Sequence, residues 1–167
     1  MLLKNIQLNY VHHQAPDQYG KYSVQLVLAP KHPQLQEIDN ALNAALAKGV
    51  EKGKIDAKNQ QSALRDYKDK ITQPDGSLVI QTSSVTPVPA YNAAGDQVRS
   101  VYGGSTGHAK VNFFAYKFGK RQGLSAGLDS LLVLQNLAPQ YGQFDDYADV
   151  DEVKDPSLLR PDDELKF

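Results

Sequence analysis

Alternating apolar and polar residues recur along the chain and predict a protein built mainly from β-strands. In the stretch KYSVQLVL, one face carries Tyr22, Val24, Leu26 and Leu28, and the other carries Lys21, Ser23, Gln25 and Val27. Such alternation suits a strand with one face against a core and the other in water. Similar runs bounded by Gly, Pro, Asn or Asp cover residues 3–11, 21–29, 77–85, 109–118 and 127–137, with a weaker hairpin over 89–99. These short strands are typical of a small antiparallel barrel or sandwich.

One segment departs from this pattern and predicts an amphipathic helix over residues 33–49. It begins at Pro33, ends at Gly49, and places apolar residues at helical spacing: Leu35, Ile38, Leu42, Ala45 and Leu46. A second, poorer helix is predicted over residues 56–69, before a turn at 74–77. The predicted fold class is therefore mainly β with one or two helices.

The strand HAKVNFFAYKF is the most informative stretch for function. One face is apolar, with Ala109, Val111, Phe113 and Ala115, and the other combines charge, amide and rings in Lys110, Asn112, Phe114, Tyr116 and Phe118. A site for single-stranded nucleic acid needs aromatic platforms for bases beside cations for phosphates. A predicted loop adds further cations at Lys117, Lys120 and Arg121. The alternative is that the rings are ordinary hydrophobic cover and the lysines ordinary solubilising charge.

Two other short stretches pair aromatic and basic residues. The first contains Tyr19, Lys21 and Tyr22, and the second contains Arg99 and Tyr102. These residues line the same groove if the barrel brings their strands together, although each stretch alone is more often plain surface.

Charge is divided unevenly between two parts of the chain. Residues 1–143 carry 15 bases and 10 acids, a net charge of +5, whereas residues 144–167 carry three bases and nine acids, a net charge of −6. A basic body with an acidic tail is typical of proteins that bind polyanions, and the tail is a candidate competitor for the same surface. Because apolar periodicity stops beyond Gly142, we predict one domain over 1–143 and a largely disordered tail over 144–167.

Composition argues against several other classes. The 167 residues fit one domain plus a tail, and the chain has no cysteine for a disulfide or a thiolate metal site. The start of the chain lacks the core of a signal peptide, and no run approaches the ~18 apolar residues of a membrane span. We expect a soluble, cytoplasmic protein with no membrane partner.

Nothing in the chain predicts catalysis. The glycine run GGSTGHAK lacks the phosphate-loop spacing and leads into a strand. His12 and His13 are adjacent, so they point to opposite faces of a strand, and no third metal ligand stands at a useful spacing. Asp129 stands alone between leucines, so we expect its carboxylate to lie at a strand end or bulge and to have no catalytic role. We expect no enzyme, no cofactor and no metal site.

These stretches, in their order, resemble the single-stranded-DNA-binding proteins of short-tailed, T-odd-type bacteriophages and related phage replication proteins. The resemblance covers YGKYSVQLVLAPKHPQLQEIDNAL, PVPAYNAAGDQV, VYGGSTGHAKVNFFAYKF, GLDSLLVLQNL, the acidic DDYADV and the terminal Phe167. It implies an OB-fold, a five-stranded Greek-key barrel, and sequence-independent binding of single strands in phage DNA replication and recombination. It also implies a homodimer.

The resemblance further implies a role for the acidic tail. In that family the tail contacts the replication polymerase and helicase and occupies the protein's own DNA groove. The matching positions here are Asp162, Asp163, Glu164 and Phe167. Acids of a flexible tail then mimic phosphates while Phe167 mimics a base. This tail departs from the family pattern because Lys154, Arg160 and Lys166 interrupt its acids, and tryptophan is absent from the whole chain.

Two alternatives stay open at this point. One is a phage structural or assembly protein whose β-barrel is basic and whose tail docks into a neighbouring subunit. The other is an accessory OB-fold domain of a nuclease or ligase, for which no metal-binding carboxylate cluster is visible. Only a single-strand-binding protein predicts a strong preference for single strands.

Overall fold

A computed structural model of the chain describes residues 1–137. The chain divides into two units, Met1–Asn136 and Leu137–Phe167, and the first is the subject of the description below. The predicted domain boundary after Gln143 and the predicted acidic tail lie outside the described residues.

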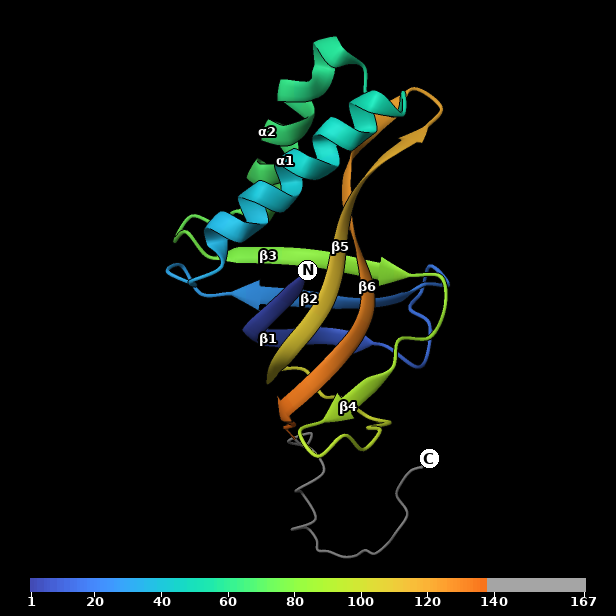
Figure 1. Cartoon of the computed structure of the whole chain (residues 1–167). Coiled ribbons are helices and arrows are strands. Elements are labelled where there is room, and N and C mark those ends of the chain that lie inside the picture. The colour runs from blue at the N-terminus through green and yellow to red at the C-terminus, as the bar shows by residue number, and fades with distance from the viewer. Residues whose placement is uncertain (138–167) are drawn as a thin grey trace, which may run out of the picture. The chain divides into compact units, whose positions relative to one another are not determined.

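The first unit is a closed five-stranded barrel (Figure 1). Its strands are β1 (Leu2–His12), β2 (Tyr22–Leu28), β3 (Leu78–Ser84), β5 (Ser105–Phe118) and β6 (Arg121–Gln135). Antiparallel pairing joins β3, β2, β1, β5 and β6 in that order, and a parallel contact between β3 and β6 closes the ring. This topology is that of an OB-fold, so the predicted fold class is confirmed and the sandwich alternative is wrong. The short β4 (Ala90–Asn92) pairs with β6 outside the ring.

Alternation places the barrel core as predicted. Val24, Leu26 and Leu28 of β2 are fully buried, and they meet buried residues of the neighbouring strands such as Leu8 and Ile80. Two non-glycine residues of β1, Asn5 and Tyr10, have positive φ angles, where the register of β1 shifts against its partners. Such bulges reverse the local direction of side chains and bend the strand.

The β5–β6 hairpin is longer than predicted. Arg121 and Gln122 were expected in a loop, but β6 begins at Arg121 and continues the pairing from Phe118↔Arg121 inward. The tight turn needs Gly119, whose φ is +63°, a conformation that favours glycine. The hairpin therefore extends well beyond the barrel (Figure 1).

Two helices between β2 and β3 support this extended hairpin. They are α1 (Leu35–Glu51) and α2 (Gln60–Ile71), the latter preceded by a 3₁₀ turn η1 (Ala57–Asn59). In Figure 1 both helices lie beside the outer half of β5 and β6. Both predicted helices are thus confirmed.

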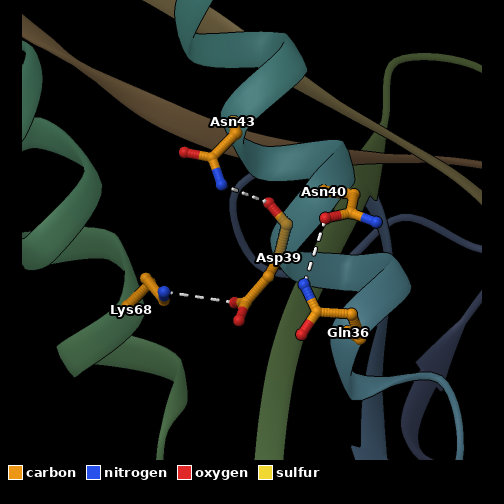
Figure 2. Close-up of polar contacts among 5 residues, drawn as sticks. All are labelled: Gln36, Asp39, Asn40, Asn43 and Lys68. Atoms are coloured by element: carbon orange, nitrogen blue, oxygen red, sulfur yellow. Dashed lines mark hydrogen bonds and ion pairs between the residues drawn. The ribbon is translucent and has the colours of Figure 1, made fainter.

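Specific contacts hold the helices to each other and to the hairpin. Figure 2 shows Lys68 of α2 reaching Asp39 of α1, with 3.2 Å between Nζ and Oδ1. Because both side chains are partly exposed, this pair contributes at most about 1 kcal/mol. Tyr67 of α2 packs edge-on against Phe113 of β5, with 6.3 Å between ring centroids. A Cβ at Gly49 would overlap the Cβ of Ala115, so glycine is what lets α1 approach β5 this closely.

Candidate nucleic-acid interface

An outward-facing row of residues crosses the barrel and joins the β5–β6 hairpin to the loop between β1 and β2. His12 of β1 pairs with Ser23 of β2, which pairs with Ser83 of β3. Ser83 pairs with Gly127 of β6 at the parallel contact, and Gly127 pairs with Asn112 of β5. With about 4.8 Å between neighbouring strands, these four steps follow a curved path of roughly 19 Å around the wall of the barrel. The residues of the row are small and polar, and one of them, Ser23, is buried and donates a hydrogen bond to Asp17 Oδ2.

The hairpin end of this row carries a line of rings. Phe114, Tyr116 and Phe118 continue the outward direction of Asn112, and Phe114 and Phe118 are 40% and 79% exposed. The opposite face of β5 is buried in the barrel and under α1, through Ala109, Val111 and Ala115. The predicted division of this strand into two faces is confirmed.

Glycines on β6 shape the outward face of the hairpin. Gly123 is paired with Tyr116, and a Cβ at Gly123 would lie 2.9 Å from Oη and 3.0 Å from Cε1 of that tyrosine. A Cβ at Gly127 would likewise lie 2.6 Å from Oδ1 of Asn112. The ring of Tyr116 and the amide of Asn112 therefore lie across the partner strand, in space that a larger residue would fill.

The carboxylate of Asp17 organises the loop at the other end of the row. Its Oδ1 accepts hydrogen bonds from the backbone N–H groups of Tyr19 (2.9 Å) and Lys21 (3.1 Å), and its Oδ2 accepts one from Ser23 Oγ (2.9 Å). The hydrogen bond from Lys21 is the main reason why the pKa of Asp17 lies below its usual value, since it stabilises the ionised form. The loop holds Tyr19 outward, 78% exposed, over a hollow of about 340 Å³ that Gln81 and His12 also line.

Tyr10 is the residue of this surface that the sequence pattern missed. Strict alternation puts it on the same face as Leu8, inside the barrel. The bulge between Asn9 and His12, with φ of +46° at Tyr10, turns the side chain outward, so that it is 69% exposed. A positive φ is uncommon for a residue other than glycine, and no local signal in the sequence announces it.

Tyr10 lies between the β1–β2 loop, which carries Tyr19, and the predicted pair Arg99 and Tyr102. It lines the hollow beneath Tyr19 and also a neighbouring hollow of about 600 Å³ that includes Tyr102. Arg99 and Tyr102 border a third hollow together with His12. The structure thus brings Tyr19, Arg99 and Tyr102 to one region. We call the row, the outward rings of the hairpin and this region the candidate interface.

Two predicted site residues lie elsewhere. Tyr22 belongs to the inward row of β2 and packs against the core, so its ring is not an open stacking surface. Lys117 lies on the opposite face of the hairpin from Tyr116, because side chains alternate along β5. Of the other predicted cations, Lys110 is exposed on the outward face, Lys120 lies in the hairpin turn, and Arg121 pairs with Phe118 on that face. Lys21 is exposed in the β1–β2 loop.

The described part of the chain offers no cluster of side chains for a metal ion. Among residues 1–137, no group of three His, Cys, Asp or Glu side chains is placed to hold a metal ion. Asp129 is exposed at a bulge of β6, where the pairing shifts between Lys110 and Val111. His13 is buried, with its Nδ1 3.0 Å from the carbonyl oxygen of Val88, while His12 is exposed. No helix within residues 1–137 is long and apolar enough to cross a membrane.

A barrel closed by a parallel β3–β6 contact, with rings and cations around an outward polar floor, defines an OB-fold of the oligonucleotide-binding type. Comparison with known families makes the assignment specific. Residues 1–156 match the family model of the single-stranded-DNA-binding protein of Enterobacter phage Enc34, and the chain belongs to that family. The suspected resemblance to phage proteins of this kind is confirmed. Since the members of the family are DNA-binding proteins, the prediction that the chain is not an enzyme is confirmed as well.

Solved structures share the fold at low sequence identity. The single-stranded-DNA-binding protein from bacteriophage Enc34 in complex with single-stranded DNA is 17% identical, with a TM-score of 0.61, covering 83% of this chain and 88% of that chain. The same phage protein in another structure is 17% identical, with a TM-score of 0.60, covering 90% of this chain and 86% of that chain. The single-stranded-DNA-binding protein gp2.5 of bacteriophage T7 is 16% identical, with a TM-score of 0.57, covering 90% of this chain and 94% of that chain. At these identities the likeness establishes the fold. No curated protein matches the chain.

Proposed function

We propose that this protein binds single-stranded DNA along the candidate interface without marked sequence preference. The observation that carries the proposal is the row of small polar residues from Asn112 to His12, in which Ser23 is buried and which has exposed rings at both ends. Base stacking on Phe114, Tyr116 and Tyr19 tolerates any sequence, because every base has an aromatic face. Membership in a phage single-stranded-DNA-binding family supports the same function.

The cations around the interface suit the phosphates of the strand. Lys21 is near Tyr19 in the β1–β2 loop, Arg99 shares a hollow with Tyr102, Arg121 pairs with Phe118, and Lys110 lies on the outward face of β5. None of these cations has a carboxylate partner among residues 1–137. The body as a whole carries a net charge of +5. Long-range attraction between this charge and a polyanion raises both the rate and the strength of binding at low salt.

A binding titration with single-stranded DNA, duplex DNA and RNA at several salt concentrations tests the proposal. If about four cations meet phosphates, log K falls against log salt with a slope of roughly −3, from about −0.7 per contact. We expect a strong preference for single strands over duplex. A flat salt response would contradict the electrostatic part of the proposal, and equal affinity for duplex would favour a phage structural or assembly protein instead.

We further propose that the protein serves phage DNA replication and recombination as a homodimer in the host cytoplasm. The support is its family and the resemblance of its ordered motifs to those of phage replication proteins. In this proposal the acidic tail recruits the replication polymerase and helicase through Asp162, Asp163, Glu164 and Phe167. These residues lie outside the described part of the chain.

The tail is also proposed to compete with DNA for the candidate interface. A tethered segment meets its site at an effective concentration near millimolar, so even a weak contact lowers the apparent affinity for DNA several-fold. Deleting residues 144–167 is expected to tighten binding, and less so at high salt, where the attraction between opposite charges is screened. Deleting Phe167 alone is expected to impair capture of the polymerase. Unchanged affinity after tail deletion would mean that the acidic end is a solubilising extension.

A further inference from the structure

Three lysines surround a hollow at the free edge of β5, beside the candidate interface. The hollow measures about 350 Å³, within the range of ligand pockets, and lies between the end of α1 and the outer part of the hairpin. Lys48, Lys52 and Lys54 line it on the helix side, and Asn112 and Phe114 line it on the strand side. The sequence pattern assigns no role to these lysines.

The end of α1 is folded so that all three lysines face this hollow. Gly53 adopts a φ of +74°, its N–H donates to the carbonyl of Val50 (3.1 Å), and the N–H of Lys54 donates to the carbonyl of Gly49 (2.8 Å). These two hydrogen bonds form a Schellman motif, which turns the chain back across the helix end. Ile55, which is 1% exposed, anchors the returning chain in the core. Lys54 therefore lies beside the last turn of the helix.

The ordinary role of basic residues at a helix end does not account for this cluster. Cations in the last turn are favourable because of the partial negative charge there, which explains Lys48 and Lys52. Lys54 follows the turn at Gly53 and still lines the same hollow.

The acids around the cluster do not neutralise it. Among residues 1–137 none of the three lysines forms an ion pair. Two acids are near in sequence: Glu51 is exposed, and Asp56 is engaged by Gln122, whose Nε2 donates to Oδ2 (3.3 Å). The hollow is therefore a site of net positive charge at the edge of a strand.

We infer that this lysine cluster binds the phosphates of a DNA strand that continues beyond the barrel. The inference rests on the proposed function and deepens it. Asn112 and Phe114 belong both to the candidate interface and to the hollow, so a strand that crosses the row reaches the lysines without leaving the surface. Phe114 supplies a stacking platform at the junction, and the three lysines supply charge for the next phosphates.

Two full-length variants with the same change in net charge test the inference. One combines Lys48→Gln, Lys52→Gln and Lys54→Gln. The control combines Lys31→Gln, Lys58→Gln and Lys70→Gln, three exposed lysines that line none of the hollows described above. Affinity is measured on thymidine strands of about 4 and about 16 nucleotides, the two ends of the usual range of OB-fold site sizes.

The cluster variant is expected to lose affinity for the long strand only. Three lost phosphate contacts reduce the salt slope by about 2, which corresponds to a loss of about 100-fold at 0.1 M salt that fades towards 1 M. The short strand and the control variant are expected to stay within a few-fold of wild type. Lysine acetylation read by mass spectrometry is expected to show that the long strand protects Lys48, Lys52 and Lys54 but not Lys58.

Other outcomes overturn the inference in distinguishable ways. Equal losses in the two variants would mean that only net charge matters, and equal losses on short and long strands would place the lysines within the main site. A tightened affinity in the cluster variant would mean that the acidic tail of this chain occupies the hollow. If wild type itself shows no preference for single strands, the proposed function fails before the variants are compared.

Discussion

The ring of Tyr116 lies over Gly123, the residue paired with it across the β5–β6 hairpin. A methyl group at Gly123 would come within 2.9 Å of the tyrosine Oη, but only the end of an outward side chain would have to move. We therefore expect Gly123→Ala to displace the ring, to weaken single-strand binding several-fold and to change the melting temperature little. A DNA titration beside a thermal melt measures both. Full affinity in this variant would show that the position of the Tyr116 ring does not matter for binding.

Replacing an outward ring of β5 by alanine is expected to weaken DNA binding, whereas replacing the inward ring is expected to lower the stability of the fold. Phe114→Ala or Tyr116→Ala weakens DNA binding by about 1–3 kcal/mol if the ring stacks on a base, with little loss of stability. Phe113→Ala is the control, because this ring packs against Tyr67 and the core, and its loss destabilises the fold by about 3 kcal/mol.

Affinity per folded molecule decides between the two roles. If Phe114→Ala and Tyr116→Ala lower the melting temperature while the affinity of the folded fraction is unchanged, these rings serve packing and not binding.

Gly107 contrasts with Gly123 because its neighbour is backbone. A Cβ at Gly107 would overlap the carbonyl oxygen of Leu132 on β6, and neither strand can yield without breaking its pairing. We expect Gly107→Ala to destabilise the protein by about 3 kcal/mol. Urea denaturation of this variant beside Gly123→Ala measures the difference. Equal stability of the two variants would contradict the distinction between backbone and side-chain neighbours.

The sequence predicts the faces of single strands better than their pairing. Alternation in β2 and β5 correctly assigns most residues to the inner or outer face, because each strand keeps a regular pleat there, but Ser23 of the outer face of β2 is buried through its contact with Asp17. It fails at Tyr10, where a bulge reverses the side chain. Tyr22 shows a different error, since its nearness to Tyr19 in sequence suggested a shared site although its own alternation places it inside.

Long-range register explains most of what the sequence left out. The row that unites the candidate interface depends on the parallel contact of Ser83 with Gly127, residues 44 positions apart in sequence. No local pattern determines such a contact. The lysine cluster was missed for a similar reason: Lys48 and Lys52 are ordinary polar positions of an amphipathic helix until β5 is placed beside them.

Stability at alkaline pH is expected to depend on Tyr67. Burial raises the pKa of Tyr67 from 10.0 to about 12, because the ionised ring is poorly solvated between α2 and Phe113. The unfolded chain therefore ionises first. The stabilising contribution is complete below pH 10 and is lost as the pH rises through about 12, by roughly 2 to 3 kcal/mol.

Tyr67→Phe isolates this contribution, since it keeps the ring and removes the titrating group. Urea denaturation at about pH 8 and about pH 11 is expected to show a smaller loss of stability in the variant than in wild type. Equal pH dependence in the two proteins would assign the alkaline loss to other groups.

The carboxylate of Asp17 is expected to control DNA binding through the loop that presents Tyr19. Asp17→Ala removes the acceptor for the N–H groups of Tyr19 and Lys21, so the loop loses its order and DNA affinity falls several-fold while the barrel stays folded. Asp17→Asn is the matched control, because its side-chain oxygen still accepts both hydrogen bonds. The DNA affinity of this variant is expected to stay near that of wild type.

Since the pKa of Asp17 is lowered, the stabilisation of the loop is complete above the usual value of 3.8 and is lost only as the pH falls through the lower folded value. Hydrogen exchange of residues 17–21 at neutral pH, beside the DNA titration, measures loop order and affinity together. Equal protection of the loop amides from exchange in Asp17→Ala and wild type would contradict this account of how Tyr19 is placed. So would a DNA affinity that does not change together with that protection.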